Sequence, residues 1–201
     1  MKSVLPTLAL FASLAAACAA APAASATDVV LPHGDGACVA TTTAKTTIYS
    51  RPSQAADPFA SVDGGLAQPV SARTEDGWLG FDPGVAQAAN MGPFRLRWFW
   101  HEDVQLSGDC AGLPSLWGPE AGYCYDMPMD AVLVHGEPSA AASVLTTLEP
   151  GQFAAVLGIS QAGWAEIDLQ LGNTGLAGRG WVDAQTLNLN GSACGELPHL
   201  P

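Results

Sequence analysis

The chain has 201 residues, a formal net charge of −12 and only seven lysine or arginine residues. Proteins that dock on nucleic acid or on anionic lipid headgroups use clustered basic side chains, and here the only close basic pair is Arg95 and Arg97. Nucleic acid and membrane surfaces are therefore disfavoured as partners. Hydrophobic residues make up 48% of the chain, and its 22 glycines and 15 prolines favour short strands and many turns over long helices.

The first 26 residues are typical of an export signal. Lys2 supplies the positive start, an apolar run extends from Val4 to Ala17, and Ala24-Ser25-Ala26 matches an A-x-A cleavage site. The apolar run is shorter than the roughly 20 residues needed to span a membrane, and no later stretch is long and apolar enough to do so. We therefore expect an exported chain without a transmembrane span, with a signal peptide over 1–26 and a linker over 27–37.

Cys18 allows a second interpretation of where this segment is cleaved. Leu14-Ala15-Ala16-Ala17-Cys18 resembles the bacterial lipoprotein box, in which the cysteine becomes the lipidated first residue. That box prefers leucine three residues before the cysteine, where this chain has Ala15. A lipid anchor at Cys18 and soluble secretion after Ala26 both remain open. Both place the protein outside the cytoplasm, either secreted or on the cell surface.

An internal repeat organises the rest of the chain. Cys38 recurs as Cys124 (124 − 38 = 86), and the Pro-Ser and Gly-Trp dipeptides of the first half recur at the same spacing. From residue 90 onward the spacing is 83, as for Trp98 and Trp181 (181 − 98 = 83), so one change of three residues in length separates the halves. So many matches at two spacings indicate a duplicated unit, and a repeat of this kind determines the fold.

Each unit begins and ends with a cysteine, and an even number of cysteines in an exported chain indicates disulfides. The arrangement favours Cys38–Cys110 and Cys124–Cys194 among the three connectivities that four cysteines allow. Zinc is the alternative, but structural zinc sites need cysteines at short spacing, which this chain lacks. We expect a first domain over 38–110, a linker over 111–123, a second domain over 124–194 and a C-terminal tail over 195–201.

Apolar residues within each unit alternate with a period of two, which is typical of strands. Turn-forming clusters of glycine, aspartate and proline separate the alternating runs. Several short strands in a unit of about 70 residues indicate a small barrel or sandwich. The runs with strand character are 46–49, 78–82, 94–100, 131–134 and 164–168.

The order of these elements resembles the bacterial SH3-like (SH3b) domain, whose loose pattern is a strand with Gly-Pro-Ser, then Gly-Trp, then Gly-Trp-Val. The resemblance covers nearly the whole chain after the signal segment. It implies an all-β fold of two tandem SH3-like barrels, with ligands such as peptidoglycan peptides or other proteins. The matching pieces are Arg51-Pro52-Ser53, Gly77-Trp78 and Trp98 in the first unit, and Glu137-Pro138-Ser139, Gly163-Trp164 and Gly180-Trp181-Val182 in the second.

The chain departs from the family pattern at four places. Arg51 and Glu137 replace the glycine before the proline, and Arg97 replaces the glycine before the second tryptophan of the first unit. The hairpin from Pro83 to Pro93 is long for the family. These departures bear on the ligand rather than on the fold.

Six side chains are the candidate ligand-binding residues. Side chains alternate along a strand, so Trp78 faces away from the core if Leu79 and Phe81 face it, and Trp164 does the same in the second unit. A half-exposed tryptophan offers a large apolar area and a polar N–H for recognition, while packing over the barrel rim is the alternative. By resemblance, the same groove is flanked by Trp98 and Trp181 and lined by Tyr49 and His135.

The sequence argues against catalysis. Every cysteine of the two units has a predicted partner, which leaves no nucleophilic thiol, and neither G-x-S-x-G nor H-E-x-x-H occurs. We therefore expect no enzyme activity, no catalytic residue, no metal site and no cofactor. Arg95 and Arg97 could meet a ligand carboxylate, although a solvated strand face is the simpler interpretation.

The function predicted from the sequence is non-catalytic binding of a cell-wall peptide or a protein ligand. Two copies of one unit raise avidity if the ligand is repetitive. The alternative is a structural or interaction protein, or an inhibitor, that contacts a secreted protein partner. The long hairpin from Val85 to Met91 would then serve as a protruding contact. The oligomeric state is left open.

Overall fold

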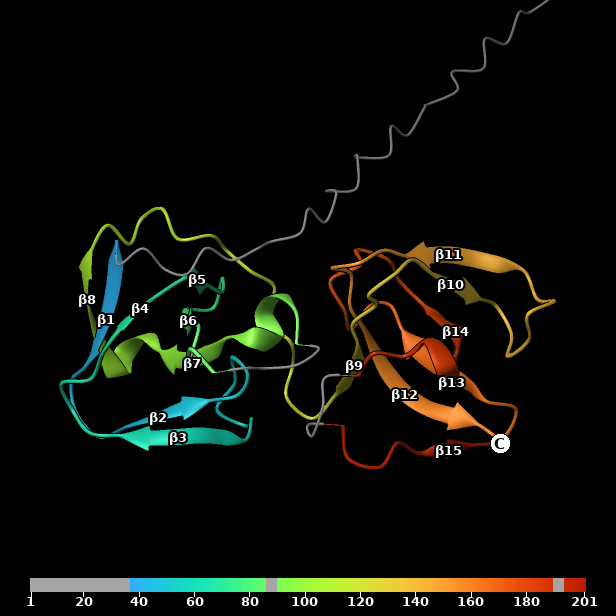
Figure 1. The fold of residues 1–201 in the computed structure, drawn as a ribbon, viewed down its shortest axis with the longest axis horizontal. Coiled ribbons are helices and arrows are strands. Elements are labelled where there is room, and N and C mark those ends of the chain that lie inside the picture. The colour runs from blue at the N-terminus through green and yellow to red at the C-terminus, as the bar shows by residue number, and fades with distance from the viewer. Residues whose placement is uncertain (1–36, 86–89, 190–193) are drawn as a thin grey trace, which may run out of the picture.

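A computed structural model of the protein describes residues 37–85, 90–189 and 194–201. The predicted signal peptide, Cys18 and residues 27–36 lie outside these described residues. The described residues are all-β, as predicted, and form two lobes that lie side by side (Figure 1). Within the described ranges, no helix has the length and apolarity that a membrane crossing requires.

The first unit contains two antiparallel sheets, with strand orders β4–β1–β8 and β3–β2–β7–β6–β5. Two short 3₁₀ helices, Gly92–Arg95 and His101–Asp103, precede β7 and β8. The strands are β1 (Cys38–Thr42), β2 (Thr46–Tyr49), β3 (Pro58–Val62), β4 (Ala67–Pro69), β5 (Ala72–Arg73), β6 (Trp78–Phe81), β7 (Arg97–Trp100) and β8 (Val104–Gly108).

The second unit contains one sheet of order β11–β10–β14–β13–β12–β15, in which β9 also pairs with β12. All of its pairs are antiparallel except β12–β15, which is parallel. The 3₁₀ helix Ala184–Thr186 follows its last long strand. The strands are β9 (Cys124–Asp126), β10 (Val132–His135), β11 (Val144–Leu148), β12 (Ala154–Ser160), β13 (Trp164–Asp168), β14 (Arg179–Asp183) and β15 (His199–Leu200).

The predicted strands are present with small changes of length. The run predicted over 94–100 is shortened to Arg97–Trp100, because Gly92 has a positive φ of 48° and Pro93 follows it, so Phe94 falls in a 3₁₀ turn. None of the three sheets closes on itself through the strand pairings of the described residues. The fold that the structure establishes is therefore all-β with three sheets.

The same strand pairings occur in both units. Tyr49 pairs with Trp98 across β2 and β7, and His135 pairs with Trp181 across β10 and β14. A register shift precedes Tyr49 in the β2–β3 pair, and the equivalent shift precedes His135 in the β10–β11 pair. Tyr49 and His135 stand 86 residues apart and Trp98 and Trp181 stand 83 apart, so the two spacings found in the sequence are spacings between equivalent strand positions.

Each Gly-Trp turn is built in the same way. Gly77 and Gly163 have φ values of 100° and 80°, a left-handed conformation that glycine adopts without strain. The backbone N–H groups of Trp78 and Trp164 donate to the hydroxyl oxygen of the threonine or serine four residues earlier, at 3.0 and 3.2 Å. These turns fix where each tryptophan enters its strand.

Both predicted disulfides are present and join Cys38 to Cys110 and Cys124 to Cys194. The first ties the start of β1 to the chain just after β8, and the second ties the start of β9 to the end of its unit. Disulfides persist in oxidising compartments. They therefore indicate an extracytoplasmic location for the protein.

A hydrophobic cluster lies between the two units, apart from the core of each. Phe94 from the first unit contacts Phe153 edge-on, with ring centroids 5.1 Å apart, and lies 5.4 Å from the ring of Tyr125. Trp117, in the segment that connects the units, contacts Tyr125 at 5.3 Å. Phe94, Tyr125 and Phe153 are all at most 5% exposed. The described end of the long hairpin, Met91 included, therefore packs inward against the second unit, and residues 86–89 lie outside the described residues.

Candidate functional site

The predicted aromatic face of the first unit is filled by its own side chains. Trp78 is 4% exposed and Trp98 has no exposed surface, and both belong to one buried cluster. Half-buried Tyr49 meets Trp78 edge-on, with 5.4 Å between ring centroids. Leu116, from the connecting segment, packs against the same cluster. Trp78 and Trp98 are therefore packing residues in this structure, and of the three only Tyr49 is half-buried rather than buried.

This burial has a specific cause. Side chains do alternate along β6 as predicted, since Leu79 and Phe81 lie in the main core and Trp78 lies on the opposite face. All four residues of β6 are buried, however, because Trp100 and Leu116 cover that opposite face. The alternation was predicted from the sequence, but the covering of this face by Trp100 and Leu116 was not.

The predicted residues of the second unit come together on a more open face. Trp164 and Trp181 are half-buried, and His135 is 8% exposed. His135 meets Trp164 edge-on, with ring centroids 5.3 Å apart. Its Nδ1 atom lies 3.1 Å from the carbonyl oxygen of Ala142, which assigns the proton to Nδ1 because a carbonyl can only accept. The imidazole is thus held in place by the chain around it.

Charged residues stand on this second face at positions that are uncharged in the first unit. Glu166 stands at the position of Gly80, and Arg179 at the position of Leu96. Arg179 lies 3.7 Å from Glu166 and 3.4 Å from Asp168. Its side chain is 60% exposed, so these pairs contribute little to stability. They leave Trp164 at the edge of a polar, solvent-facing surface.

A groove of about 770 Å³ lies at the end of the first unit that faces the connecting segment. Its walls are the Pro-Ser turn at Pro52 and Ser53, the Gly-Trp turn at Glu75 and Asp76, and the segment from residue 115 to 121. Three of its lining side chains are carboxylates and none is basic. A groove of this size and negative charge suits a small cationic or amine-bearing ligand.

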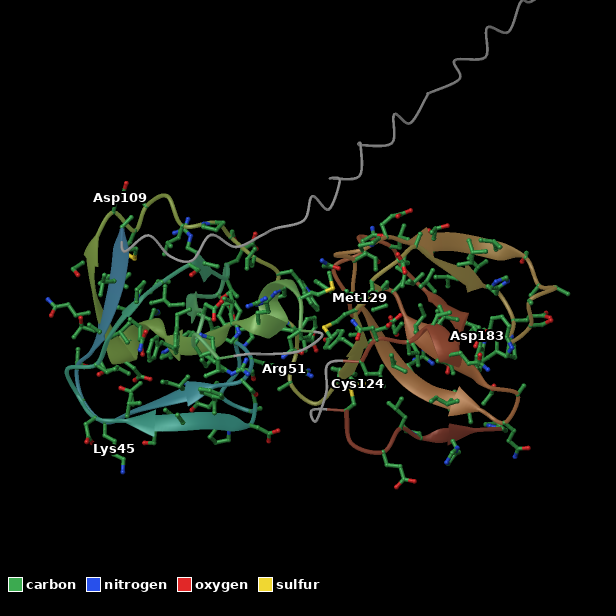
Figure 2. All side chains as sticks on the ribbon, in the orientation of Figure 1. Lys45, Arg51, Asp109, Cys124, Met129 and Asp183 are labelled. Atoms are coloured by element: carbon green, nitrogen blue, oxygen red, sulfur yellow. A yellow bond between two sulfur atoms is a disulfide. The ribbon has the colours of Figure 1, made fainter. Side chains whose placement is uncertain are left out.

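Arg51 holds in place the wall of this groove that the connecting segment forms. Its Nη1 atom donates to the carbonyl oxygens of Glu120 and Tyr123, the first at 2.6 Å. The guanidinium also lies 5.3 Å from the ring centroid of Tyr125 and 5.9 Å from that of Phe94. Burial lowers the pKa of Arg51, and the phenol of Tyr125 and the carboxylate of Asp57 oppose that shift. Figure 2 shows Arg51 at the junction of the two lobes.

Trp117 gives the groove its aromatic surface. It is half-buried, because one part of the ring packs on Tyr125 and Phe153 and the rest lines the groove. Beside it, Gly118 lies so close to Pro52 that a Cβ atom at Gly118 would stand 2.8 Å from the proline Cγ. The groove therefore depends on close packing between the connecting segment and the Pro-Ser turn.

The basic pair noted in the sequence is engaged within the first unit. Arg95 lies 3.6 Å from a carboxylate oxygen of Asp82. Arg97 stacks on the ring of Phe59 at 4.5 Å and donates to the carbonyl oxygen of Leu96 at 2.8 Å. Among residues 37–85, 90–189 and 194–201, no group of three or more histidine, cysteine or acidic side chains is placed to hold a metal ion.

Apart from Pro52 and Ser53, the residues that line this groove were not singled out from the sequence. Trp117 and Glu120 lie in the stretch predicted to be a linker, and Glu75 and Asp76 lie in the turn before Gly77. One signal was available, because Arg51 stands where the family pattern has glycine. A buried arginine needs partners, and those partners are the carbonyls of the supposed linker.

No family model matches the chain, and no curated protein matches it. Among solved structures the chain is similar to NlpC2 from Trichomonas vaginalis, at 10% sequence identity and a TM-score of 0.26. The alignment covers 75% of this chain and 47% of that chain, so this chain spans about half the length of that protein. A likeness of this degree carries no argument about function.

Proposed function

We propose that the protein is a non-catalytic binding protein of the bacterial cell envelope or exterior, made of two SH3-like units. Its ligand site is the acidic groove between the first unit and the connecting segment. The ligand is a peptide that carries a free amine, and the peptide stem of peptidoglycan fits this description because its diamino acid has such a group. The single observation that carries the proposal is the groove of about 770 Å³ with carboxylates on two of its walls.

The location of the groove supports this proposal. It lies between the Pro-Ser turn and the Gly-Trp turn, two of the three motifs on which the resemblance to SH3-like domains rests. Glu75 and Asp76 are exposed on one side and Glu120 on the other, so an ammonium group between them meets carboxylates from both directions. Trp117 supplies an apolar surface for the rest of the peptide.

The second unit offers a matched control in its own sequence. At the positions of Glu75 and Asp76 it carries Gln161 and Ala162, in the same turn before the glycine that recurs in both units. The double variant Glu75→Gln/Asp76→Ala therefore gives the first unit a turn that the same fold already accepts. We expect it to fold like the wild type and to lose charge on one wall of the groove.

The test is calorimetric titration of the mature protein with purified soluble muropeptides. We expect saturable binding by the wild type and at least tenfold weaker binding by Glu75→Gln/Asp76→Ala, a loss of about 1.4 kcal/mol or more. Acetylating the free amine of the muropeptide should weaken binding to a similar extent. Glu149→Gln, at an exposed turn of the second unit, is the control and should bind normally. Absence of binding by the wild type, or equal binding by the double variant, would contradict the proposal.

A protein partner is the second candidate function, and a separate surface favours it. β11 is the outermost strand of its sheet, and Val144 and Leu145 on it are 50% and 53% exposed, beside Leu133 at 50% on β10. An uncharged, apolar edge strand is a template for strand addition by a partner. Retention of an extracellular protein by the wild type but not by Leu145→Lys would support this candidate.

A further inference from the structure

A four-residue pattern recurs outside the two cysteine-bounded units. Leu113-Pro114-Ser115-Leu116 follows the first disulfide, and Leu197-Pro198-His199-Leu200 follows the second at a spacing of 84 (198 − 114 = 84). From the sequence, these stretches are predicted to be a linker and a tail. In the structure each lies against the edge of its own unit, and β15 runs beside β12 (Figure 1).

The two segments bind equivalent strand edges of their own units through the same backbone contacts. Ser115 forms a parallel bridge with Arg73, and His199 pairs in parallel with Ile159, which is the equivalent of Arg73 at a spacing of 86. The N–H of Arg73 donates to the carbonyl oxygen of Pro114 at 3.0 Å. The N–H of Ile159 donates to the carbonyl oxygen of Pro198 at 2.8 Å. This edge therefore accepts an added parallel strand in both units.

Leucine side chains on either side of the proline anchor each segment. Leu113 packs against the main core of the first unit, and Leu197 packs against that of the second. Two residues after the proline, Leu116 packs against the aromatic cluster of the first unit. Leu200 occupies the matching position in the second segment and lies against Gly158. The spacing of the two leucines is thus matched to two separate contacts on the unit.

Gly158 makes the close approach possible in the second unit. A Cβ atom at this position would stand 2.6 Å from the carbonyl oxygen of Pro198 and 2.8 Å from Cγ of Leu200. Neither distance is tolerable for carbon, so any side chain at residue 158 would push the segment away. In the second unit this contact therefore leaves no room for a methyl group, although the first unit has Ala72 at the equivalent position.

Proline fits the middle of the pattern for a physical reason. It has no N–H to donate and its φ is fixed near the extended range, so it suits an edge position where only its carbonyl is bonded. Its restricted backbone also lowers the entropy lost when a peptide docks. The pattern Leu-Pro-x-Leu therefore describes a ligand sequence as well as a structural segment.

The two copies differ in how firmly the segment is held. The first is followed by Trp117, which packs between the units, and by the carbonyls that Arg51 binds. Leu116 also donates its N–H to the carbonyl oxygen of Arg73 at 2.8 Å. In the second copy, His199 is exposed and the strand is two residues long. The segment is otherwise held by its two-residue pairing with β12 and by Leu197 and Leu200, and a peptide of the same sequence can exchange with it because it makes the same contacts.

We propose that the edge formed by Gly158, Ile159 and Ser160 of β12 is a peptide-binding site for extended Leu-Pro-x-Leu segments of other polypeptides. β15 is the built-in occupant of this site and competes with the external ligand. Recognition occurs by parallel strand addition, with the leucines giving specificity and the backbone giving affinity. This site is separate from the acidic groove of the first unit, and the proposal does not depend on that groove.

The test uses the full chain with its disulfides intact and a labelled peptide of sequence Gly-Glu-Leu-Pro-His-Leu-Pro, followed by fluorescence anisotropy. The variant Leu200→Ser weakens the built-in occupant, which otherwise competes at an effective concentration near the millimolar range. We expect this variant to bind the peptide at least tenfold more tightly than the wild type. Adding Gly158→Ala to it should abolish binding, and a peptide with both leucines changed to serine should not bind.

A second readout needs no destabilising variant. In the wild type, millimolar peptide should displace β15 and move the imidazole resonances of His199 toward those of the free peptide in a saturable way, and this shift should be absent with the serine-substituted peptide. Binding that is the same in Leu200→Ser and in the wild type, or that persists with Gly158→Ala, would overturn the proposal. So would a peptide-independent dimer lost in Gly158→Ala, because the edge would then serve a second copy of this chain.

Discussion

Trp164 meets His135 edge-on with ring centroids 5.3 Å apart, and Trp78 meets Tyr49 in the same way at 5.4 Å, at the equivalent positions of the other unit. The ring planes stand at 81° and 85°. One aromatic pair has thus been kept in both copies, although its surroundings differ. In the first unit the pair is enclosed by further apolar side chains, and in the second it faces charged ones.

This difference predicts unequal effects of removing the two tryptophans. Trp78→Ala should lower the free energy of unfolding by about 3–5 kcal/mol, because it leaves a cavity beside Trp98 and Trp100. Trp164→Ala should cost about 1 kcal/mol or less, because a half-buried side chain leaves little empty space. Guanidinium unfolding of both variants, monitored by far-UV circular dichroism with the disulfides intact, measures the two losses. Equal losses would mean that the second face is as tightly packed as the first.

Much of the fold could be predicted from the sequence because the repeat is carried by local signals. The turns at Pro52-Ser53 and Gly77-Trp78 need particular residue types, and those types recur at a fixed spacing. The cysteines at the ends of each unit then favoured one pairing among the three that are possible. Cys38–Cys110 and Cys124–Cys194 are present as expected.

The candidate site was harder to predict because it depends on contacts between distant parts of the chain. Composition marks residues 111–123 as a linker, since they are rich in glycine and proline, yet Leu116 covers one face of the first unit and Trp117 joins the two units. Period-two alternation tells which side of a strand a residue faces, but not what covers that side. Trp98, which was predicted to flank the groove, is buried for this reason, and its side chain has no exposed surface.

Arg51 should be the residue whose loss most loosens the joint between the units. Arg51→Ala leaves the carbonyls of Glu120 and Tyr123 without their donor and opens space beside Phe94. We expect a loss of about 2–4 kcal/mol in the free energy of unfolding. Arg51→Lys should lose less, because an ammonium group keeps the charge but lacks the planar fork. Arg95→Ala is the control, since the Arg95 side chain is 46% exposed, and it should change stability by less than about 0.5 kcal/mol. A loss no greater for Arg51→Ala than for this control would argue against the clamp.

Reduction of the disulfides should destabilise each unit by a similar amount. The two bonds close loops of nearly equal length, with sequence separations of 72 and 70 residues. The chain-entropy model gives a loss of about 4 kcal/mol for each bond. The double variants Cys38→Ser/Cys110→Ser and Cys124→Ser/Cys194→Ser, unfolded side by side, measure this loss for each unit. A variant that unfolds at the same denaturant concentration as the wild type would show that its bond adds nothing.

Asp126 should make the second unit less stable as the pH rises from about 4 to above 6. Its side chain has no exposed surface, and burial raises its pKa from 3.8 to about 6, against hydrogen bonds from the backbone N–H groups of Asn188 and Met127. Between these two pKa values the folded state keeps a proton that the unfolded state has released. The stabilising contribution is therefore complete below pH 4 and is lost as the pH rises through 6.

The variant Asp126→Asn isolates this effect. Its side-chain amide keeps an oxygen that can accept the hydrogen bond from the N–H of Asn188, but the amide cannot ionise. A shift of about two pKa units corresponds to roughly 3 kcal/mol. The free energy of unfolding of the variant, relative to the wild type, should therefore rise by about that amount between pH 4 and pH 7, while the contributions of all other titrating groups cancel. Guanidinium unfolding at a series of pH values gives this difference directly. A difference that stays constant with pH would mean that Asp126 has an ordinary pKa in the folded protein.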